Sequence, residues 1–361
     1  MKNKNFLFAA AKIMRFSKIC NIFAKIFNFF LMKKIIGIGN ALIDILLQIP
    51  DDSILTVLNL QKGSMQLVDE QKMSEIFEKL NRFSKKMVTG GSAANTINGI
   101  SKLGGITGFL GKIGNDETGR FFEDDIIKNG VNAHLLRSEK PSGRCLSLIS
   151  PDGERTLCTC LGAAGDLQIA DINPEIFNNY EICYIEGYLV QNQELIRRAV
   201  ALAAEMELLV TIDMASFNIV EENLDFLHEI VKKYVNIVFA NEEEAFAFAK
   251  DSPVEALNII AQNVDISIVK VGKDGSFIKS GNSIFPIQPF AADVIDTTGA
   301  GDLYAAGFLY GLANHYQLDI CGKIGSLVAS EIVQTIGAKL NDDVWLKIKN
   351  QIEEIILEKN K

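Results

Sequence analysis

Metal-binding residues are scarce in this chain of 361 residues. Its three histidines, His134, His228 and His315, are widely spaced, and its six cysteines form no CxxC pair. A zinc site is therefore not expected, because it needs several such ligands at short spacings. Cys158 and Cys160 would share one face of a strand, but no further ligand accompanies them, so we interpret them as core residues. Cysteines used in this way fit a reducing compartment, and we expect a cytoplasmic protein.

Basic residues are fewer than acidic ones over most of the chain. The net charge is −9, but residues 1–31 carry six lysines or arginines and no acid, so the remainder carries −15. A body this acidic repels a phosphate backbone, so we expect no nucleic-acid partner. Nucleotides stay open as ligands because local donors hold them, whatever the net charge.

The first 31 residues lack an uninterrupted apolar run long enough to cross a bilayer. One apolar stripe at helical spacing passes through them, formed by Ile13, Phe16, Cys20, Phe23, Phe27 and Phe30. This basic amphipathic extension could lie on a membrane surface. The alternative, which we favour, is that the native protein starts at Met32, directly before a strand-like segment, and makes no membrane contact.

The two common glycine-rich nucleotide motifs are also missing. "GIGNALID" has Gly37 and Gly39, but Leu42 stands where the dinucleotide-binding fingerprint needs its third glycine. No stretch satisfies the Walker pattern GxxxxGK[ST]. If the protein uses ATP, it must hold the nucleotide in another way.

From residue 34 onward, apolar β-branched runs alternate with helical patterns. The runs that predict strands are residues 35–39, 106–114, 181–187, 208–213, 236–241 and 266–272. The segments that predict helices are 92–103, 117–129, 192–206, 223–233, 242–249, 253–262, 300–313, 319–335 and 343–358. Continuous apolar strands separated by helices favour a mostly parallel sheet that is covered on both faces.

Two regions depart from this rhythm. Residues 45–70 and 143–160 alternate apolar and polar positions, which is typical of strands with one wet face. A turn at Pro151-Asp152-Gly153 would join two of these strands. We interpret the two regions as a small sheet that projects from the main domain, residues 32–361, and serves as a lid.

The strongest functional signal is "DTTGAGDLYAAGFLYGL", residues 296–312. Gly299, Ala300 and Gly301 lie at the N-terminus of a long apolar helix, where free N–H groups and the helix dipole favour an anion. Asp302 could then take a proton from a hydroxyl that attacks a bound phosphoryl group. The structural alternative is a helix start with glycines for packing, although glycine inside a helix costs about 1 kcal/mol relative to alanine.

Two further stretches allow a functional and a structural interpretation. In "TGGSAANT", Gly90 and Gly91 let a ligand approach the backbone and Asn95 follows one turn later, but a tight turn also explains them. In "FANEEEA", Asn241 and Glu244 could hold hydrated Mg²⁺, although a helix N-cap with acidic first-turn residues explains the same letters.

Taken together, these motifs resemble those of a known kinase family. "GNALIDI", "TGGSAANT", "YIEGYLV", "FANEEEA" and "DTTGAGDLYAAGFLYG" occur in the order and spacing of the ribokinase–adenosine kinase (PfkB-type) family of sugar and nucleoside kinases. The resemblance covers about residues 33 to 340. It implies a three-layer α/β/α ribokinase-like fold with a mostly parallel central sheet and a small β lid.

The resemblance also implies roles for the residues that match. Asp302 would be the catalytic base, and the amides of Gly299, Ala300 and Gly301 would bind the γ-phosphate of ATP. Asn241 and Glu244 would position Mg²⁺ through water. Residues that would bind the acceptor are Asn40, Asp44, Gly90, Gly91 and Asn95, and weaker candidates for ATP contacts are Gly272, Gly275 and Thr297.

The lid sequence is more similar to that of adenosine kinases than to that of ribokinases. Arg155 would contact the transferred phosphoryl group, and Met65 and Leu67 could pack against a base. We therefore expect an ATP- and Mg²⁺-dependent kinase that phosphorylates the primary hydroxyl of a nucleoside, adenosine first. A ribokinase- or fructokinase-type sugar kinase is the main alternative, and a non-catalytic relative that binds the same ligands is a weaker one. The family also implies a monomer or homodimer, and Asp296 near the place of a K⁺ ion.

Overall fold

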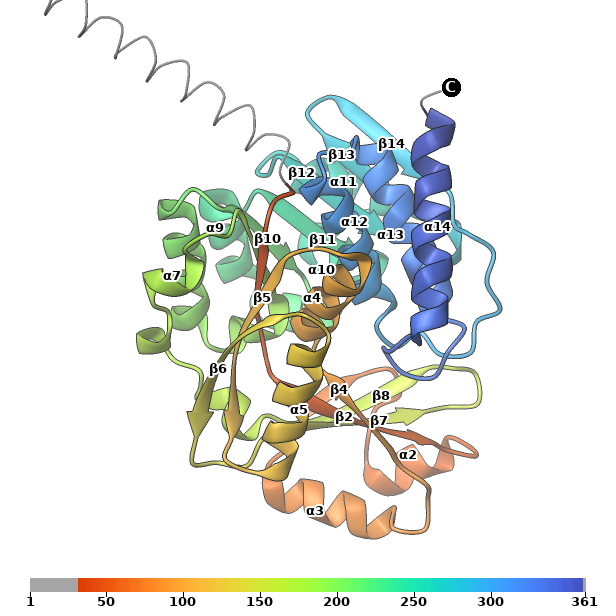
Figure 1. Ribbon diagram of the computed structural model, residues 1–361. Helices are drawn as coiled ribbons and strands as arrows, with labels where there is room; N and C mark the ends of the chain where they lie inside the picture. The colour runs from red at the N-terminus through yellow and green to blue at the C-terminus, as the bar shows by residue number, and fades with distance from the viewer. Residues whose placement is uncertain (1–31, 360–361) are drawn as a thin grey trace, which may run out of the picture.

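The apolar runs that predicted strands form six of the nine strands of the central sheet, and residues 132–138, 276–280 and 283–287 form three further strands that the sequence did not predict. The computed structural model describes residues 32–359, and Figure 1 shows their path. In sheet order the nine strands are β14 (Ser283–Ile287), β13 (Ser276–Ser280), β12 (Ile266–Lys270), β11 (Ile237–Asn241), β10 (Leu209–Asp213), β9 (Ile182–Glu186), β1 (Ile35–Ile38), β5 (Thr107–Gly114) and β6 (Asn132–Ser138). Strands β12 to β6 in this order run parallel, and β13 and β14 add an antiparallel hairpin at one edge.

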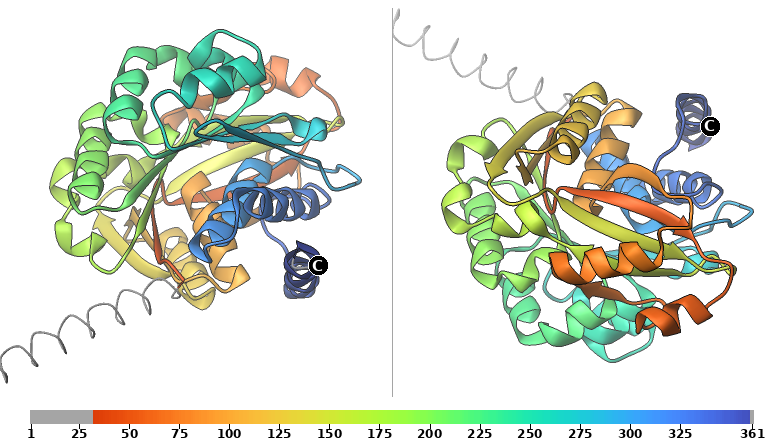
Figure 2. Two further views of the ribbon diagram at one scale, coloured as in Figure 1. Left: turned by 90° about the horizontal axis from the view of Figure 1, so that it is seen from above. Right: turned by 90° about the horizontal axis from the view of Figure 1, so that it is seen from below.

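Helices cover both faces of this sheet and make three layers, which the left view of Figure 2 shows from above. One layer consists of α4 (Ser92–Leu103), α5 (Glu117–Lys128), α12 (Ala300–Ala313), α13 (Leu318–Ile332) and α14 (Asp342–Lys359). The other consists of α7 (Gln193–Glu205), α8 (Phe217–Glu222), α9 (Leu224–Tyr234), α10 (Glu242–Ala249) and α11 (Pro253–Ile260). Short connections include α6 (Pro174–Phe177) and the 3-10 turns η1 (Gly162–Asp166), η2 (Ile169–Asp171), η3 (Gly187–Gln191) and η4 (Gly272–Asp274).

Alternating side chains of each central strand feed two separate cores. In β9, Ile182 and Tyr184 pack toward α4 and α12, whereas Cys183 and Ile185 pack toward α7 and α9. Both faces of the strand are buried, so the sequence reads as a continuous apolar run rather than an alternation. The predicted fold class, with its mostly parallel sheet between two helical layers, is confirmed.

A second sheet of five strands lies at one end of the central sheet (Figure 2, right). In sheet order its strands are β3 (Met65–Leu67), β8 (Arg155–Cys160), β7 (Gly143–Ile149), β2 (Leu42–Gln48) and β4 (Lys86–Gly90). The predicted hairpin turn joins β7 to β8, where Ser150 N–H donates to the Glu154 carbonyl at 2.9 Å and Gly153 has φ +84°. That the sheet works as a lid stays a prediction.

The expected wet face of this second sheet is wrong for two of its strands. All residues of β2 except Gln48 are buried, and β7 is buried at all positions except Arg144. The reason is that α2 (Ser53–Leu58) and α3 (Glu70–Lys79) cover one face, while the other face borders a cavity. Helix α2 lies within residues 45–70, so the alternating pattern is wrong in predicting strands at residues 53–58, and α3 and β4 were not predicted.

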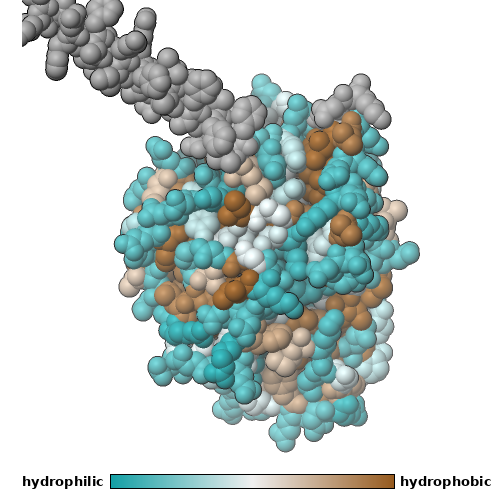
Figure 3. All heavy atoms as spheres, viewed as in Figure 1, coloured by the Kyte–Doolittle hydropathy of each residue, from teal (hydrophilic) through white to brown (hydrophobic). Residues whose placement is uncertain are grey.

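Hydrophilic residues cover most of the face that Figure 3 shows, and apolar residues form small separate patches on it. No helix within residues 32–359 is long and apolar enough to cross a bilayer. The predicted amphipathic extension, residues 1–31, lies outside the described residues, so its role stays a prediction.

Candidate active site

A cavity of about 1010 Å³ lies between the carboxyl ends of the central strands and the second sheet. This is the edge at which open parallel sheets bind their ligands. Every residue predicted to act in catalysis or to bind the acceptor, ATP or Mg²⁺ lines the cavity, except Gly90. The predicted residues on its wall are Asn40, Asp44, Gly91, Asn95, Arg155, Asn241, Glu244, Gly272, Gly275, Thr297, Gly299, Ala300, Gly301 and Asp302.

The start of α12 has the open geometry that the glycines suggested. Gly299 is the N-cap residue with φ +73°, and no side chain caps this helix. Only glycine fits there comfortably, because a Cβ would lie 2.5 Å from the Cβ of Ala338. The Ala300 N–H donates to the Thr297 carbonyl at 3.2 Å, so this amide already has a partner and the predicted set of three free donors is reduced.

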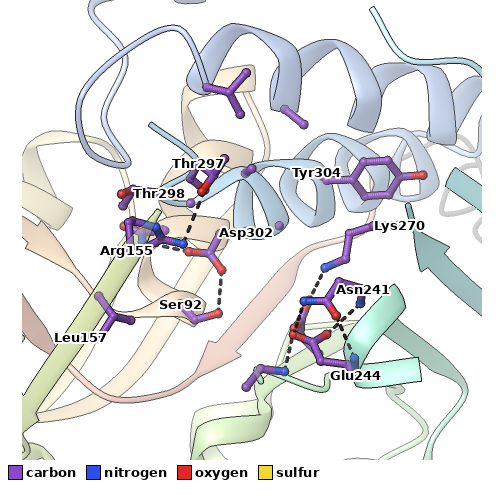
Figure 4. A pocket seen from close by; sticks show the side chains of 18 of the residues that line it. Ser92, Arg155, Leu157, Asn241, Glu244, Lys270, Thr297, Thr298, Asp302 and Tyr304 are labelled. Atoms are coloured by element: carbon purple, nitrogen blue, oxygen red, sulfur yellow. Dashed lines mark hydrogen bonds and ion pairs between the residues drawn. The ribbon is translucent and has the colours of Figure 1, made fainter. Parts of the chain in front are cut away.

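The Asp302 carboxylate is held from two sides (Figure 4). Ser92 Oγ donates to its Oδ1 at 2.7 Å, and Asn95 Nδ2 donates to its Oδ2 at 2.9 Å. Burial raises the pKa of Asp302, against the two hydrogen bonds, which lower it. The side chain is thus oriented toward the cavity with a carboxylate that is more basic than an ordinary aspartate.

The acceptor-binding candidates form the opposite wall. The N–H and Nδ2 of Asn40 donate to Glu186 Oε1 at 2.8 and 2.6 Å, and the Ala93 N–H donates to Glu186 Oε2 at 2.9 Å. These bonds leave the Asn40 side-chain carbonyl for a ligand. Burial raises the pKa of Asp44 to about 7, although the charge of Arg155 opposes that rise.

Gly90 does not line the cavity, but it packs directly behind a residue that does. A Cβ at Gly90 would lie 2.1 Å from the Asp44 Cγ, so glycine makes room for that carboxylate. Gly91 has φ +92°, and a Cβ there would lie 2.2 Å from the Asn40 carbonyl oxygen. The glycine pair therefore makes room for the Asp44 carboxylate and for the backbone of Asn40.

Arg155 connects the second sheet with the start of α12. It begins β8, and its Nη2 donates to the Thr297 carbonyl at 3.5 Å. Its Nε lies 3.9 Å from Asp296 Oδ1. Asp296 itself is fully buried, and its carboxylate accepts from the N–H and hydroxyl of Thr298 and from the Gly337 N–H. The oxygens of Asp296 thus tie two loops together, and its link to K⁺ stays a prediction.

The Mg²⁺ candidates form the reciprocal capping box of α10. Asn241 Oδ1 accepts from the Glu244 N–H, while Glu244 accepts from the N–H and Nδ2 of Asn241, each at 2.8 Å. Burial raises the pKa of Glu244 to about 7, and the nearby charge of Asp213 adds to the rise. The buried carboxylates of Glu244 and Asp213 have one ammonium beside them, that of Lys270. The negative charge that is left over suits a divalent cation.

Within residues 32–359, no group of three or more histidine, cysteine, aspartate or glutamate side chains could hold a metal directly. Mg²⁺ keeps most of its water and needs few direct carboxylates, so the residues present fit this ion better than a fully protein-ligated one.

Several cavity residues were not among the predicted candidates, and three of these lie at strand ends. Glu186 ends β9, Asp213 ends β10, and Lys270 ends β12, all at the cavity edge of the sheet. Their position at or near the carboxyl end of a predicted parallel strand was the available signal. The order of strands in the sheet decides which of them meet, and no local pattern encodes that order.

Comparisons with known proteins agree with this geometry. Residues 67–344 match the family described as pfkB family carbohydrate kinase. In structure, the chain is similar to an adenosine kinase from Sinorhizobium meliloti, with a TM-score of 0.83 and 30% identity over 89% of this chain and 99% of the other.

Curated relatives point to both nucleoside and sugar acceptors. The chain is 25% identical to adenosine kinase 2 of Arabidopsis thaliana over 331 residues, which are 84% of this chain and 94% of the relative. It is 28% identical to an uncharacterized sugar kinase of Archaeoglobus fulgidus over 246 residues, which are 67% of this chain and 96% of the relative.

The family match spans more than half of the chain and includes both glycine-rich signatures. Such kinases are phosphotransferases with an alcohol group as acceptor, which implies ATP and usually Mg²⁺. With its fold, its cavity and this match in agreement, the chain belongs to the pfkB family of carbohydrate kinases.

Proposed function

We propose that the protein is an adenosine kinase, which transfers the γ-phosphoryl group of ATP to the primary hydroxyl of adenosine. The observation that carries this proposal is the apolar floor that the second sheet adds to the acceptor end of the cavity. Its side chains are Leu42, Met65, Leu67, Leu157 and Leu161. A purine base offers a flat apolar surface of this kind, whereas a free sugar does not.

The polar groups beside this floor suit a ribose. Asp44 lies on β2 and Asn40 lies in the link just before that strand, and a carboxylate accepts hydrogen bonds from two neighbouring hydroxyls. A nucleoside would then place its base on the apolar floor and its sugar between Asn40 and Asp302. The adenosine kinases of Sinorhizobium meliloti and Arabidopsis thaliana are the relatives whose names support this acceptor.

The residues around the reacting atoms have complementary tasks in this proposal. Asp302 accepts the proton of the attacking hydroxyl, and Ser92 and Asn95 hold its carboxylate in place. The amides at the start of α12 and the Arg155 guanidinium bind the phosphoryl group. Asn241 and Glu244 would hold the water shell of Mg²⁺, which neutralises charge on the ATP phosphates when bound.

A sugar kinase is the second candidate, favoured by the similarity to the Archaeoglobus fulgidus protein. A binding protein without activity is less favoured, because a protein that only binds needs neither the carboxylate of Asp302 nor the pair of Asn241 and Glu244.

The direct test is turnover of ATP and Mg²⁺ against adenosine, inosine, ribose, fructose and fructose 6-phosphate. We expect AMP and ADP from adenosine, with kcat/KM at least about tenfold above that of any sugar. Turnover of a sugar without turnover of any nucleoside would replace the adenosine proposal by the sugar kinase, and the family assignment would stand.

A further inference from the structure

Three neighbouring strands end in polar side chains at the cavity. Strands β10, β11 and β12 are adjacent and parallel, and their last residues are Asp213, Asn241 and Lys270. Asn241 and Lys270 lie opposite each other in the register of the sheet. The function proposed above uses Asn241 but assigns no task to Asp213 or Lys270.

Asp213 and Lys270 form a buried ion pair. Lys270 Nζ lies 3.1 Å from Asp213 Oδ2, and the two side chains are only 13% and 8% exposed. Burial alone would lower the pKa of Lys270, but the charges of Asp213 and Glu244 outweigh it and the pKa is raised. The amine is therefore an ammonium with three donors, of which Asp213 takes one.

The ammonium lies directly beside the start of α12 (Figure 4). A Cβ built on Gly301 would lie 3.1 Å from Lys270 Nζ. Gly301 belongs to the turn whose amides we propose to bind the phosphoryl group, so an anion on those amides would be within reach of Lys270. The side chain comes from the sheet, and it thus completes this subsite from a second element.

Positive charge is sparse in the cavity. Among the described residues, the basic ones that line it are Arg155, Lys270 and Lys273. The acidic ones are Asp44, Glu154, Glu186, Asp213, Glu242, Glu243, Glu244 and Asp302. An incoming triphosphate adds further negative charge, and of the three cations only Lys270 comes from the carboxyl edge of the central sheet beside Gly301.

We propose that Lys270 is a catalytic residue whose ammonium contacts the γ-phosphoryl group during transfer, and that Asp213 is the positioning residue that holds it there. The proposal depends on the kinase family and not on adenosine as the acceptor. An ammonium in a dry site stabilises charge on the moving phosphoryl group more strongly than it would in water.

The step needs no further reactant. A bond forms between the acceptor oxygen and the γ-phosphorus while the bond from that phosphorus to the bridging oxygen breaks. The electron pair stays on the bridging oxygen, which becomes a terminal oxygen of ADP, and the hydroxyl proton goes to Asp302. Lys270 keeps its proton throughout and only stabilises charge.

A purely structural ion pair is the alternative, and kinetics separate the two. Lys270→Met removes the charge at nearly constant volume, and Lys270→Gln removes the charge but keeps a donor for Asp213. We expect either variant to lower kcat by about 10²–10³, while KM for the acceptor stays within roughly threefold. Lys270→Arg should recover part of the loss because it keeps the charge.

Binding gives a second readout that needs no acceptor. By calorimetry with Mg²⁺, Lys270→Met should weaken a non-hydrolysable ATP analogue but leave ADP affinity unchanged, because only the analogue carries a γ-phosphoryl group. Asp213→Asn should show the same pattern more weakly, with kcat lowered and the acceptor KM unchanged. Equal losses for ADP and the analogue would contradict the proposed contact.

Lys112 offers a matched control in the same sheet. It lies on β5, pairs with Asp171 at 2.9 Å and is 9% exposed, but it does not line the cavity. Lys112→Met removes a structural ion pair, so it should lower the unfolding temperature. It should leave kcat of the folded protein unchanged. A folded Lys270→Met or Lys270→Gln protein whose kcat is within roughly threefold of the wild type would overturn the proposal. If adenosine is not the acceptor, the same assay runs with the acceptor that the panel identifies.

Discussion

At the scale of single residues, the chemistry of this site depends on carboxyl groups that the fold has buried. Burial raises the pKa of Asp44, Glu186, Glu244 and Asp302, although hydrogen bonds or a nearby cation oppose the rise in each case. The raised pKa of Asp302 supports its proposed role as the base, because a more basic carboxylate takes a proton from an alcohol more readily. Because burial also raises the pH at which Asp302 is protonated, we expect that protonation to limit activity on the acid side.

Replacing Asp302 should remove the proposed base without removing the ligand site. We expect Asp302→Asn to lower kcat by about 10²–10⁴, with adenosine affinity within about tenfold of the wild type. Steady-state kinetics and calorimetry measure the two effects. The exposed Asp225 on α9 provides the control, and Asp225→Asn should keep full activity. Unchanged turnover in Asp302→Asn would rule this residue out as the base.

The pH dependence of kcat should carry the same signature. The pKa of Asp302 in the folded protein is raised, so the proton binds at a higher pH than on an ordinary aspartate, whose pKa is about 3.9. As pH falls through the raised value, the base is lost and kcat falls with it. We therefore expect an acid limb that begins clearly above pH 4, and a profile that stays flat down to that value would speak against the assignment.

At the scale of elements, the start of α12 combines two glycines with different tasks. Gly299 needs its left-handed backbone, and a Cβ there would collide with Ala338. Gly301 has helical neighbours, and its Cβ would meet only the flexible end of Lys270. We therefore expect Gly299 to matter for folding of the turn and Gly301 to matter for activity.

Alanine at each glycine should give contrasting results. Gly299→Ala should destabilise the fold by about 1–2 kcal/mol for the backbone conformation alone, with a further cost from the contact with Ala338. Gly301→Ala should keep the unfolding temperature close to that of the wild type but lower kcat, because the methyl group displaces Lys270. Thermal unfolding and kinetics on both variants test this contrast, and equal stability losses would contradict it.

At the scale of the whole molecule, the cavity exists only because two sheets meet. The central sheet contributes the polar strand ends, and the second sheet contributes the apolar floor and Arg155. Arg155 then reaches from β8 to the loop before α12. In the proposed function, the second sheet supplies the apolar floor for the acceptor, while Arg155 of that sheet and the start of α12 bind the phosphoryl group in the same cavity.

The apolar floor of the second sheet should therefore control binding of the acceptor rather than of ATP. Leu157→Ala removes part of the apolar floor, and at about 25 cal/mol per Å² of lost apolar contact we expect KM for adenosine to rise about tenfold. KM for ATP and kcat should change little. Val57 on α2 is 68% exposed and serves as the control, because Val57→Ala removes a side chain of the second sheet's outer cover. A rise in the ATP KM instead would place the adenosine elsewhere.

Local patterns in the chain determined the alternation of strands and helices, the glycine-rich turn before α12 and the capping box of α10. These features follow from neighbouring residues, since burial on both faces, caps and left-handed turns each leave a mark within a few positions. The predicted helix 300–313 has the same bounds in the structure. The residues of the two glycine motifs and of the capping box could be named for the same reason.

Tertiary structure decided which of these residues meet, and sequence patterns could not show it. Strand order brings Lys270 to Asp213 in an ion pair and Asn40 to Glu186 in a hydrogen bond. The path of the loop before α12 decides which carbonyl accepts from the Ala300 N–H. The helices α2 and α3 likewise cover a face of the second sheet that the alternating pattern predicted to be exposed to solvent. Contacts between segments far apart in the chain leave no periodic trace in either segment, so only the packed molecule shows them.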